Sequence, residues 1–251
     1  SARMHRHTRE LLRRYHQLQI IDRPPPRRIL SDEVVAFESR TEREAYDAVG
    51  EYVRVRYDVL ETERPGKGFV MVIYQRRAAS SWGALRASIA SRVDALKQQR
   101  EALVAAHQCM TFDLGAANDV SLDDLQDLEL DAPDVDPALP PTVEGVDLEL
   151  IQLARVQAKL DAVSNTDTKA QRLYERLRTW SVEGRPTLVF TAFTDTVAHL
   201  RDEWLVQEWG DSLATYTGGG GQRLRDGKWV PVRKDEITAA LFAGEIKVLL
   251  C

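Results

Sequence analysis

The sequence predicts an α/β fold in which a partial parallel sheet follows a mostly helical segment. Short β-prone apolar runs alternate with amphipathic helical stretches between residues 185 and 251, and long stretches before them carry apolar side chains at helical spacing. Strands joined by helices of these lengths pair in parallel through crossover connections. Because α/β sheets bind ligands at the carboxyl ends of their strands, we expect the functional site there.

The composition is that of an ordinary soluble globular chain, with 43% hydrophobic and 29% charged residues. No apolar run approaches the roughly 20 residues of a membrane-spanning helix, and the arginine-rich start has no apolar core behind it, so we expect no membrane partner and no secretory signal. Cys109 and Cys251 form neither a disulfide framework nor a metal-binding spacing. A reducing cytoplasm is therefore the expected location.

The net charge of −5 conceals a segregation of charge along the chain. Residues 1–28 contain eight arginines, whereas residues 113–149 contain twelve acidic residues and neither lysine nor arginine. The basic arm could meet phosphate, and the acidic run is expected to repel it and stay solvated.

The first forty residues predict a helix and a strand. Apolar side chains at helical spacing predict a helix over residues 4–18 with its leucines toward a core. Three prolines at 24–26 end it and impose an extended path. A strand is expected over residues 28–38, which contain Val34, Val35 and Phe37. His5 and His7 are two residues apart, which suits neither a helical metal pair nor a zinc-protease signature.

A helical region follows. Overlapping capping boxes at Ser39–Glu42 and Thr41–Glu44 predict the start of a helix that reaches Leu60, with tyrosines that are expected in the core rather than stacked on bases. Ser81 is expected to cap a second, long helix with Leu85 inside. Residues 107–145 are acidic and proline-rich and predict a flexible insertion, because they cannot bury enough apolar surface. Helices are then expected over residues 146–163 and 168–182, with a cap cluster at 164–167.

The last third of the chain predicts the sheet. Strands are expected at residues 187–192, 212–216 and 245–251, and helices at 195–209 and 234–243. Four glycines at 218–221 and a polar loop separate the second strand from the last helix.

Four short segments carry a resemblance to a known family. Leu188–Thr196 resembles the fourth motif of superfamily-two helicases, Tyr216-Thr-Gly the short element after the next strand, and Leu241–Cys251 the approach to the fifth motif. The Arg-x-x-Ser-Ser sequence at 77–81 is similar to a helix junction in Swi/Snf-like proteins. The nearest resemblance is to the bacterial Swi/Snf-type ATP-dependent DNA translocases.

The resemblance implies a division of the chain. Residues 1–38 would be the exit of the first motor lobe, 39–106 a helical insertion, 107–145 the acidic insertion, and 146–251 the truncated start of a second, RecA-like lobe. The family binds ATP and magnesium between two such lobes. This sequence has no Gly-x-x-x-x-Gly-Lys-Ser/Thr loop. We therefore expect a piece of a larger motor that neither binds nor hydrolyses ATP alone, with no catalytic residue and no metal site of its own.

Hydroxyls and backbone amides at strand ends can bind phosphate oxygens without recognising the base sequence. The expected partner is double-stranded DNA, together with the missing parts of both motor lobes. Local alternatives remain, because Thr194 or Asp195 could simply cap a helix, the glycines could form a flexible loop, and the arginines could hold a helix junction. The candidate DNA-contacting residues are Thr191, Phe193, Thr194, Thr196, Thr217, Gly218, Gly219, Arg76 and Arg77.

Two further hypotheses come from other classes of protein. The α/β part could be a non-catalytic scaffold that uses the helical segment to oligomerise, or the acidic insertion could bind a basic protein partner. A dinucleotide site is disfavoured, because the glycines follow the second strand and no Gly-x-Gly-x-x-Gly precedes a helix.

Overall fold

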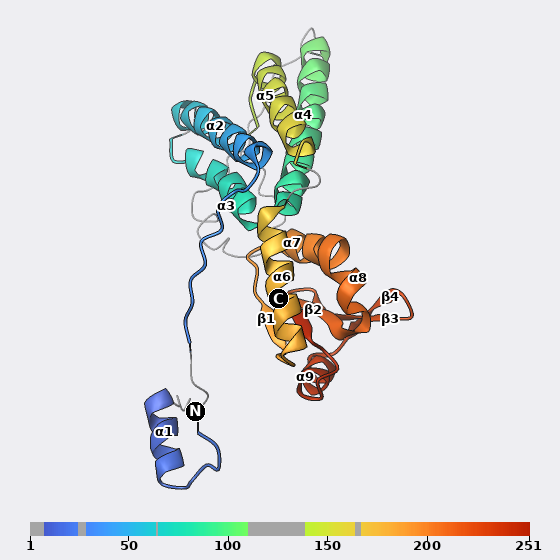
Figure 1. The fold of residues 1–251 in the computed structure, drawn as a ribbon. Coiled ribbons are helices and arrows are strands. Elements are labelled where there is room, and N and C mark those ends of the chain that lie inside the picture. Colours follow the sequence, from blue (N-terminus) through green and yellow to red (C-terminus); the bar gives the residue numbers. More distant parts are fainter. Residues whose placement is uncertain (1–7, 25–28, 64, 110–138, 164–166) are drawn as a thin grey trace, which may run out of the picture. The chain divides into compact units, whose positions relative to one another are not determined.

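A computed structural model describes residues 8–24, 29–63, 65–109, 139–163 and 167–251 (Figure 1). The chain forms two units, residues 1–34 and 35–251. The first contains α1 (Arg9–Gln17), which Thr8 caps by accepting a hydrogen bond from the Leu11 amide. No residue of α1 is buried and Leu18 is 60% exposed, so the predicted packing of this helix against a core is wrong. His5 and His7 lie outside the described residues.

The strand predicted over residues 28–38 is also absent. Residues 29–38 have no regular secondary structure, and Val34 is 94% exposed. Phe37 alone packs inward, with its ring centroid 5.3 Å from Tyr46 and 6.0 Å from Trp82. A strand needs a neighbour for its amides, and none is provided here.

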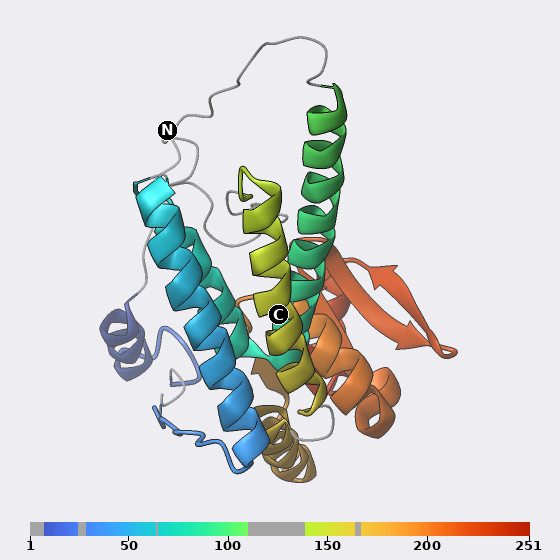
Figure 2. The ribbon, with the colours of Figure 1, turned by 90° about the horizontal axis from the view of Figure 1, so that it is seen from above.

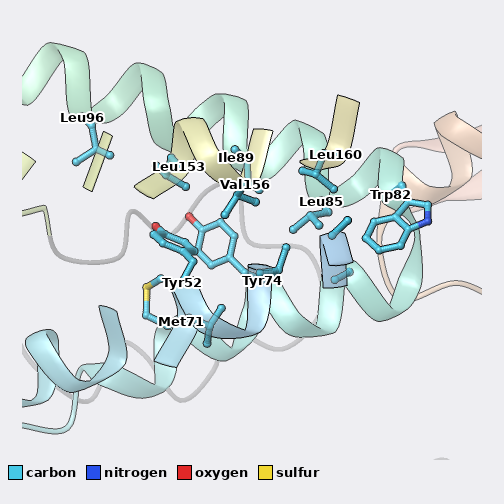
Figure 3. Close-up of a cluster of buried hydrophobic side chains, with 14 of the residues drawn as sticks. Tyr52, Met71, Tyr74, Trp82, Leu85, Ile89, Leu96, Leu153, Val156 and Leu160 are labelled. Atoms are coloured by element: carbon cyan, nitrogen blue, oxygen red, sulfur yellow. The ribbon is translucent and has the colours of Figure 1, made fainter. Parts of the chain in front are cut away.

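Helices α2 to α5 form what we call the helical module. It contains α2 (Arg40–Glu63), a 3-10 turn η1 (Gly68–Met71), α3 (Val72–Ser80), α4 (Trp82–Cys109) and α5 (Val143–Asp161). Figure 2 shows α2, α4 and α5 side by side. Their buried side chains make one continuous core (Figure 3). Of the tyrosines predicted to lie in the core, Tyr52 is 3% exposed and meets Tyr74 edge to face, and Tyr46 is half-buried against the same core, as predicted. Tyr57 is 36% exposed, so the prediction is wrong for this residue.

Helix α5 belongs to this module rather than to the sheet. Its apolar side chains Val146, Leu153, Val156 and Leu160 are buried in the core shared with α2 and α4. The helix predicted to begin the second lobe therefore packs with the helical module rather than with the sheet. Most of the predicted acidic insertion lies outside the described residues, but its two ends are helical, because α4 extends to Cys109 and α5 begins at Val143.

The sheet has five strands in the order β1-β5-β2-β3-β4. They are β1 (Thr187–Val189), β2 (Leu213–Thr217), β3 (Gly220–Arg225), β4 (Lys228–Val232) and β5 (Val248–Leu250). Strand β5 pairs in parallel with β1 on one side and β2 on the other, which confirms the predicted parallel arrangement. The predicted polar loop is instead an antiparallel hairpin of β3 and β4, so the sheet is mixed.

Helices cover both faces of the sheet. On one face, Leu213, Val248 and Leu250 pack under α6 (Thr168–Val182) and α7 (Thr194–His199). Helix α7 continues as a π-helix, η3 (Leu200–Leu205), then as α8 (Val206–Trp209) and a short 3-10 helix, η4 (Gly210–Ser212). On the other face, Ala214 and Leu249 pack under α9 (Lys234–Phe242). The α/β class therefore holds, in a chain that is mostly helical. Within the described residues, no helix combines the length and apolarity that crossing a membrane requires.

Candidate nucleic-acid interface

The three parallel strands end at one edge of the sheet, which we call the strand-end edge. The chain beyond β1 stays paired with β5, because Thr191 N donates to Cys251 O at 2.7 Å and Cys251 N donates to Val189 O at 2.8 Å. Strand β5 separates β1 from β2, so the ends of β1 and β2 lie about 10 Å apart, two strand spacings. The predicted residues after both strands therefore share this edge.

The segment after β1 presents two of its three predicted threonines. The Thr191 hydroxyl donates to Phe193 O at 3.0 Å and is half-buried. Thr194 is exposed at the first position of α7. Phe193 occupies the N-cap position without a side-chain hydrogen bond, so neither Thr194 nor Asp195 caps this helix as the local alternative proposed.

The other predicted threonine and one predicted arginine turn inward. Thr196 is 3% exposed, and its hydroxyl lies 2.9 Å from the hydroxyls of both Ser80 and Ser81. Arg77 places Nη1 2.6 Å from Asp195 Oδ2 and its guanidinium 4.9 Å from the centroid of the Phe193 ring. These contacts occupy Thr196 and Arg77 at the junction between α3, α4 and α7. For Arg77 this is the alternative role stated above, that of holding a helix junction. Arg76, one residue earlier, is exposed.

The glycines after β2 form a hairpin turn rather than a flexible loop. Thr217 pairs with Gly220 in the ladder, so exposed Gly218 and Gly219 are the two turn residues, and Gly219 N donates to Thr217 Oγ1 at 3.3 Å. Gly221 is needed for packing, because a Cβ there would lie 2.4 Å from Ile237 Cδ1 and 2.8 Å from Val232 O. The glycine run thus combines a turn at the strand-end edge with a close contact to α9.

The hairpin brings to the same edge two basic residues that the sequence patterns did not identify as site residues. Strand β4 runs back toward this edge and ends at Val232, opposite Gly221. Arg233 and Lys234 follow it and are exposed, and the Arg233 side chain is 81% accessible. The Asp226-Gly227 pair, a common hairpin turn, could have revealed the hairpin from the sequence.

Two carboxylates converge where the helical module meets α6. Glu42, expected in a capping box of its own helix, is 1% exposed and accepts from Thr168 N at 2.8 Å and Trp82 Nε1 at 3.4 Å. Asp167 caps α6 by accepting from Ala170 N at 2.9 Å, as the predicted cap cluster requires. Carboxylates are favourable here, because a helix N-terminus carries partial positive charge.

His199 is buried next to Asp167. Its Nε2 lies 3.2 Å from Asp167 Oδ2, and its Nδ1 lies 3.1 Å from Glu203 Oε1. Burial by itself would lower the pKa of His199, but hydrogen bonding and attraction to the two carboxylates outweigh it and raise the pKa above its usual value. The two carboxylates therefore stabilise the charged form of the imidazole at the C-terminal end of α7.

Hydroxyl and backbone N–H groups such as those at the strand-end edge are donors of the kind that phosphate oxygens accept. Among the described residues, no three histidine, cysteine or acidic side chains gather in a way that could hold a metal ion. The sequence contains no Gly-x-x-x-x-Gly-Lys-Ser/Thr loop. Comparisons with protein-family models, with curated proteins and with solved structures find no match.

Proposed function

We propose that this chain is part of an ATP-dependent DNA translocase of the Swi/Snf type, in which it contributes contacts to the DNA backbone. The observation that carries the proposal is the common edge at which β1, β5 and β2 end. That edge presents the Thr194 hydroxyl, Thr217, and the exposed backbone of Gly218 and Gly219, while the half-buried Thr191 hydroxyl donates its hydrogen to Phe193 O. In this proposal, the parallel strands belong to a RecA-like second lobe.

Groups of this kind suit a contact that must form and break repeatedly. Hydroxyls and backbone amides hydrogen-bond phosphate oxygens without recognising bases, and they hold them less tightly than a cluster of guanidinium groups would. Arg76, Arg233 and Lys234 add exposed positive charge. The expected behaviour is weak, sequence-independent binding to duplex DNA that weakens as salt is added.

The nucleotide part of the proposed activity depends on segments that this sequence does not contain. The family resemblance places ATP between two lobes, one of which carries the phosphate-binding loop. A malachite-green assay should detect no phosphate release from ATP by this chain, with or without duplex DNA. DNA-stimulated release would show that this assignment is wrong.

Fluorescence anisotropy with labelled duplexes of unrelated sequence tests the DNA contact. Titrations between about 25 and 200 mM salt should give affinities that do not depend on sequence and that fall linearly on a log–log plot, as counterion release requires. Arg233→Gln should reduce the slope by about 0.9, the value for one phosphate contact. The absence of binding at the lowest salt would refute the proposal.

Exposed apolar side chains on β1 and directly after it favour a second candidate, a protein-interaction module. Leu188, on the edge strand β1, is 45% exposed, and Phe190, one residue beyond the strand, is 76% exposed. Such side chains often mark contact surfaces. A scaffold of this kind would show no DNA affinity and would give a defined oligomer in light scattering.

A further inference from the structure

The corner between α3 and α4 contacts the segment that follows β1. Arg77, Ser80 and Ser81 at this corner bind Asp195 and Thr196, which are 115 to 118 residues away in sequence. One contact is an ion pair with a short 2.6 Å separation, and two join hydroxyl groups. A hydrogen-bonded ion pair of this length has a defined geometry, so it restricts both partners.

The segment is held at Thr191, whose amide donates to Cys251 O and whose hydroxyl donates to Phe193 O, and the corner contacts the residues that follow. Phe193, at the N-cap of α7, makes no side-chain hydrogen bond to the helix. Its carbonyl accepts from Thr196 N at 3.1 Å and Val197 N at 3.3 Å, and its ring lies beneath the Arg77 guanidinium. The first turn of α7 therefore depends on partners outside the helix.

The corner is well placed to act as that partner, because its own position is fixed. Ser81 caps α4 by accepting from Ala84 N at 3.0 Å, and Trp82 next to it is 4% exposed in the core of the module (Figure 3). Lys169, in the first turn of α6, donates to Ala79 O at 2.6 Å. A side chain at Gly83 would collide with His199, since its Cβ would lie 2.4 Å from the imidazole ring.

We infer that the α3–α4 corner is a clamp that sets the conformation of residues 193–196, so that the exposed Thr194 hydroxyl faces a phosphate backbone. Arg77 is then a positioning residue, while the exposed Arg76 beside it is free to meet phosphate directly. The consequence for binding rests on the proposed function. The clamp itself exists without nucleic acid and can be measured in its absence.

Two matched substitutions on the full chain separate the roles of the neighbouring arginines. Hydrogen–deuterium exchange should show about tenfold faster exchange in peptides covering residues 193–199 of Arg77→Gln, and no change there in Arg76→Gln. In the anisotropy titration, Arg77→Gln should weaken binding about tenfold with the salt slope unchanged. Arg76→Gln should instead reduce the slope by about 0.9.

Both the exchange measurement and the binding titration can contradict the clamp. Unchanged exchange at residues 193–199 in Arg77→Gln, or a slope reduced as in Arg76→Gln, would overturn the clamp. Thr196→Val, which keeps the side-chain shape but loses the hydroxyl, should also speed exchange in this segment. Peptides around Leu85, in the core of α4, exchange only when the whole chain unfolds. Their continued protection shows that faster exchange at residues 193–199 is local to that segment. If the wild-type chain does not bind DNA, the proposed function fails while the exchange data still test the clamp.

Discussion

The carboxylate of Glu42, near the start of α2, accepts a hydrogen bond at 2.8 Å from the backbone amide of Thr168, the first residue of α6. The two residues are 126 positions apart. Glu42 thus satisfies an amide that α6 cannot satisfy itself, because the first four amides of a helix lack intrahelical partners. This bond joins the helical module to the part of the chain that forms the sheet.

Glu42→Ala should therefore destabilise the fold by about 2–4 kcal/mol. The substitution leaves the Thr168 amide buried and without its acceptor, and it removes a negative charge from a helix N-terminus. Urea denaturation followed by circular dichroism measures the change. Glu44→Gln on the same helix is the control and should have little effect, because that carboxylate lies at the surface between Arg40 and Lys159. Equal losses in both variants would contradict the assignment.

A second prediction concerns the buried charges of the helical module. Glu149 is 2% exposed and accepts from Arg92 at 2.9 Å and from the Tyr52 hydroxyl at 2.8 Å, while Arg56 Nε lies 3.0 Å away. Burial and the nearby Glu149 charge raise the pKa of Tyr52, so the tyrosine remains a donor. Glu149→Ala leaves buried guanidinium groups without their carboxylate and should cost about 3–5 kcal/mol in thermal or urea unfolding.

Asp147 provides the control for this experiment on the same helix. It pairs with Arg100 at 2.7 Å, but both side chains are largely exposed. Asp147→Ala should leave the unfolding midpoint nearly unchanged, because exposed pairs are screened by water and salt. A large loss in this variant, or a small one in Glu149→Ala, would show that burial does not determine the stabilisation here.

The third prediction is a dependence of stability on pH through His199. Asp167 and Glu203 raise the folded-state pKa of this histidine above the usual value of about 6.5. A raised pKa stabilises the fold fully below the unfolded value, and this contribution is lost as the pH rises through the folded value. The free energy of unfolding of the wild type minus that of His199→Gln should therefore be constant well below the unfolded pKa of about 6.5 and fall as the pH rises through the higher folded pKa. A wild-type minus His199→Gln difference that rises with pH would mean that burial dominates over the two carboxylates, contrary to the expected sign.

Sequence patterns predicted those parts of the fold that local periodicity determines. The parallel direction of β1, β2 and β5 followed from the helices that connect them. The roles of Arg76 and Arg77 could not follow from local sequence, because the Asp195 partner of Arg77 is 118 residues away. Placing α5 with the sheet failed for a similar reason, since an amphipathic helix does not specify which core covers its apolar face.

The candidate site was predicted in outline and missed in its tertiary detail. Thr191 follows β1 and Thr217 ends β2, as their position in or after β-prone runs indicated, whereas Thr194 is the first residue of α7. Thr196 has the same residue type and neighbourhood, but Ser80 and Ser81 engage it from another element. The β3–β4 hairpin was missed although its Asp226-Gly227 turn could be read from the sequence, and the packing role of Gly221 was missed because its tightest contact is with Ile237 on α9.

The last prediction contrasts two glycines that differ in the space around them. Gly221→Ala would place a methyl group 2.4 Å from Ile237 Cδ1 and 2.8 Å from a backbone oxygen, so α9 must shift from the sheet. We expect a loss of about 1–3 kcal/mol, the usual cost of overpacking. Gly50 lies inside α2, and beyond the backbone of that helix no atom comes within 4 Å of the place that a Cβ would take. Gly50→Ala should instead stabilise the chain by about 0.5–1 kcal/mol, because alanine loses less conformational freedom in a helix. Urea unfolding of both variants measures opposite shifts, and shifts of the same sign would mean that the close contact between β3 and α9 does not form in solution.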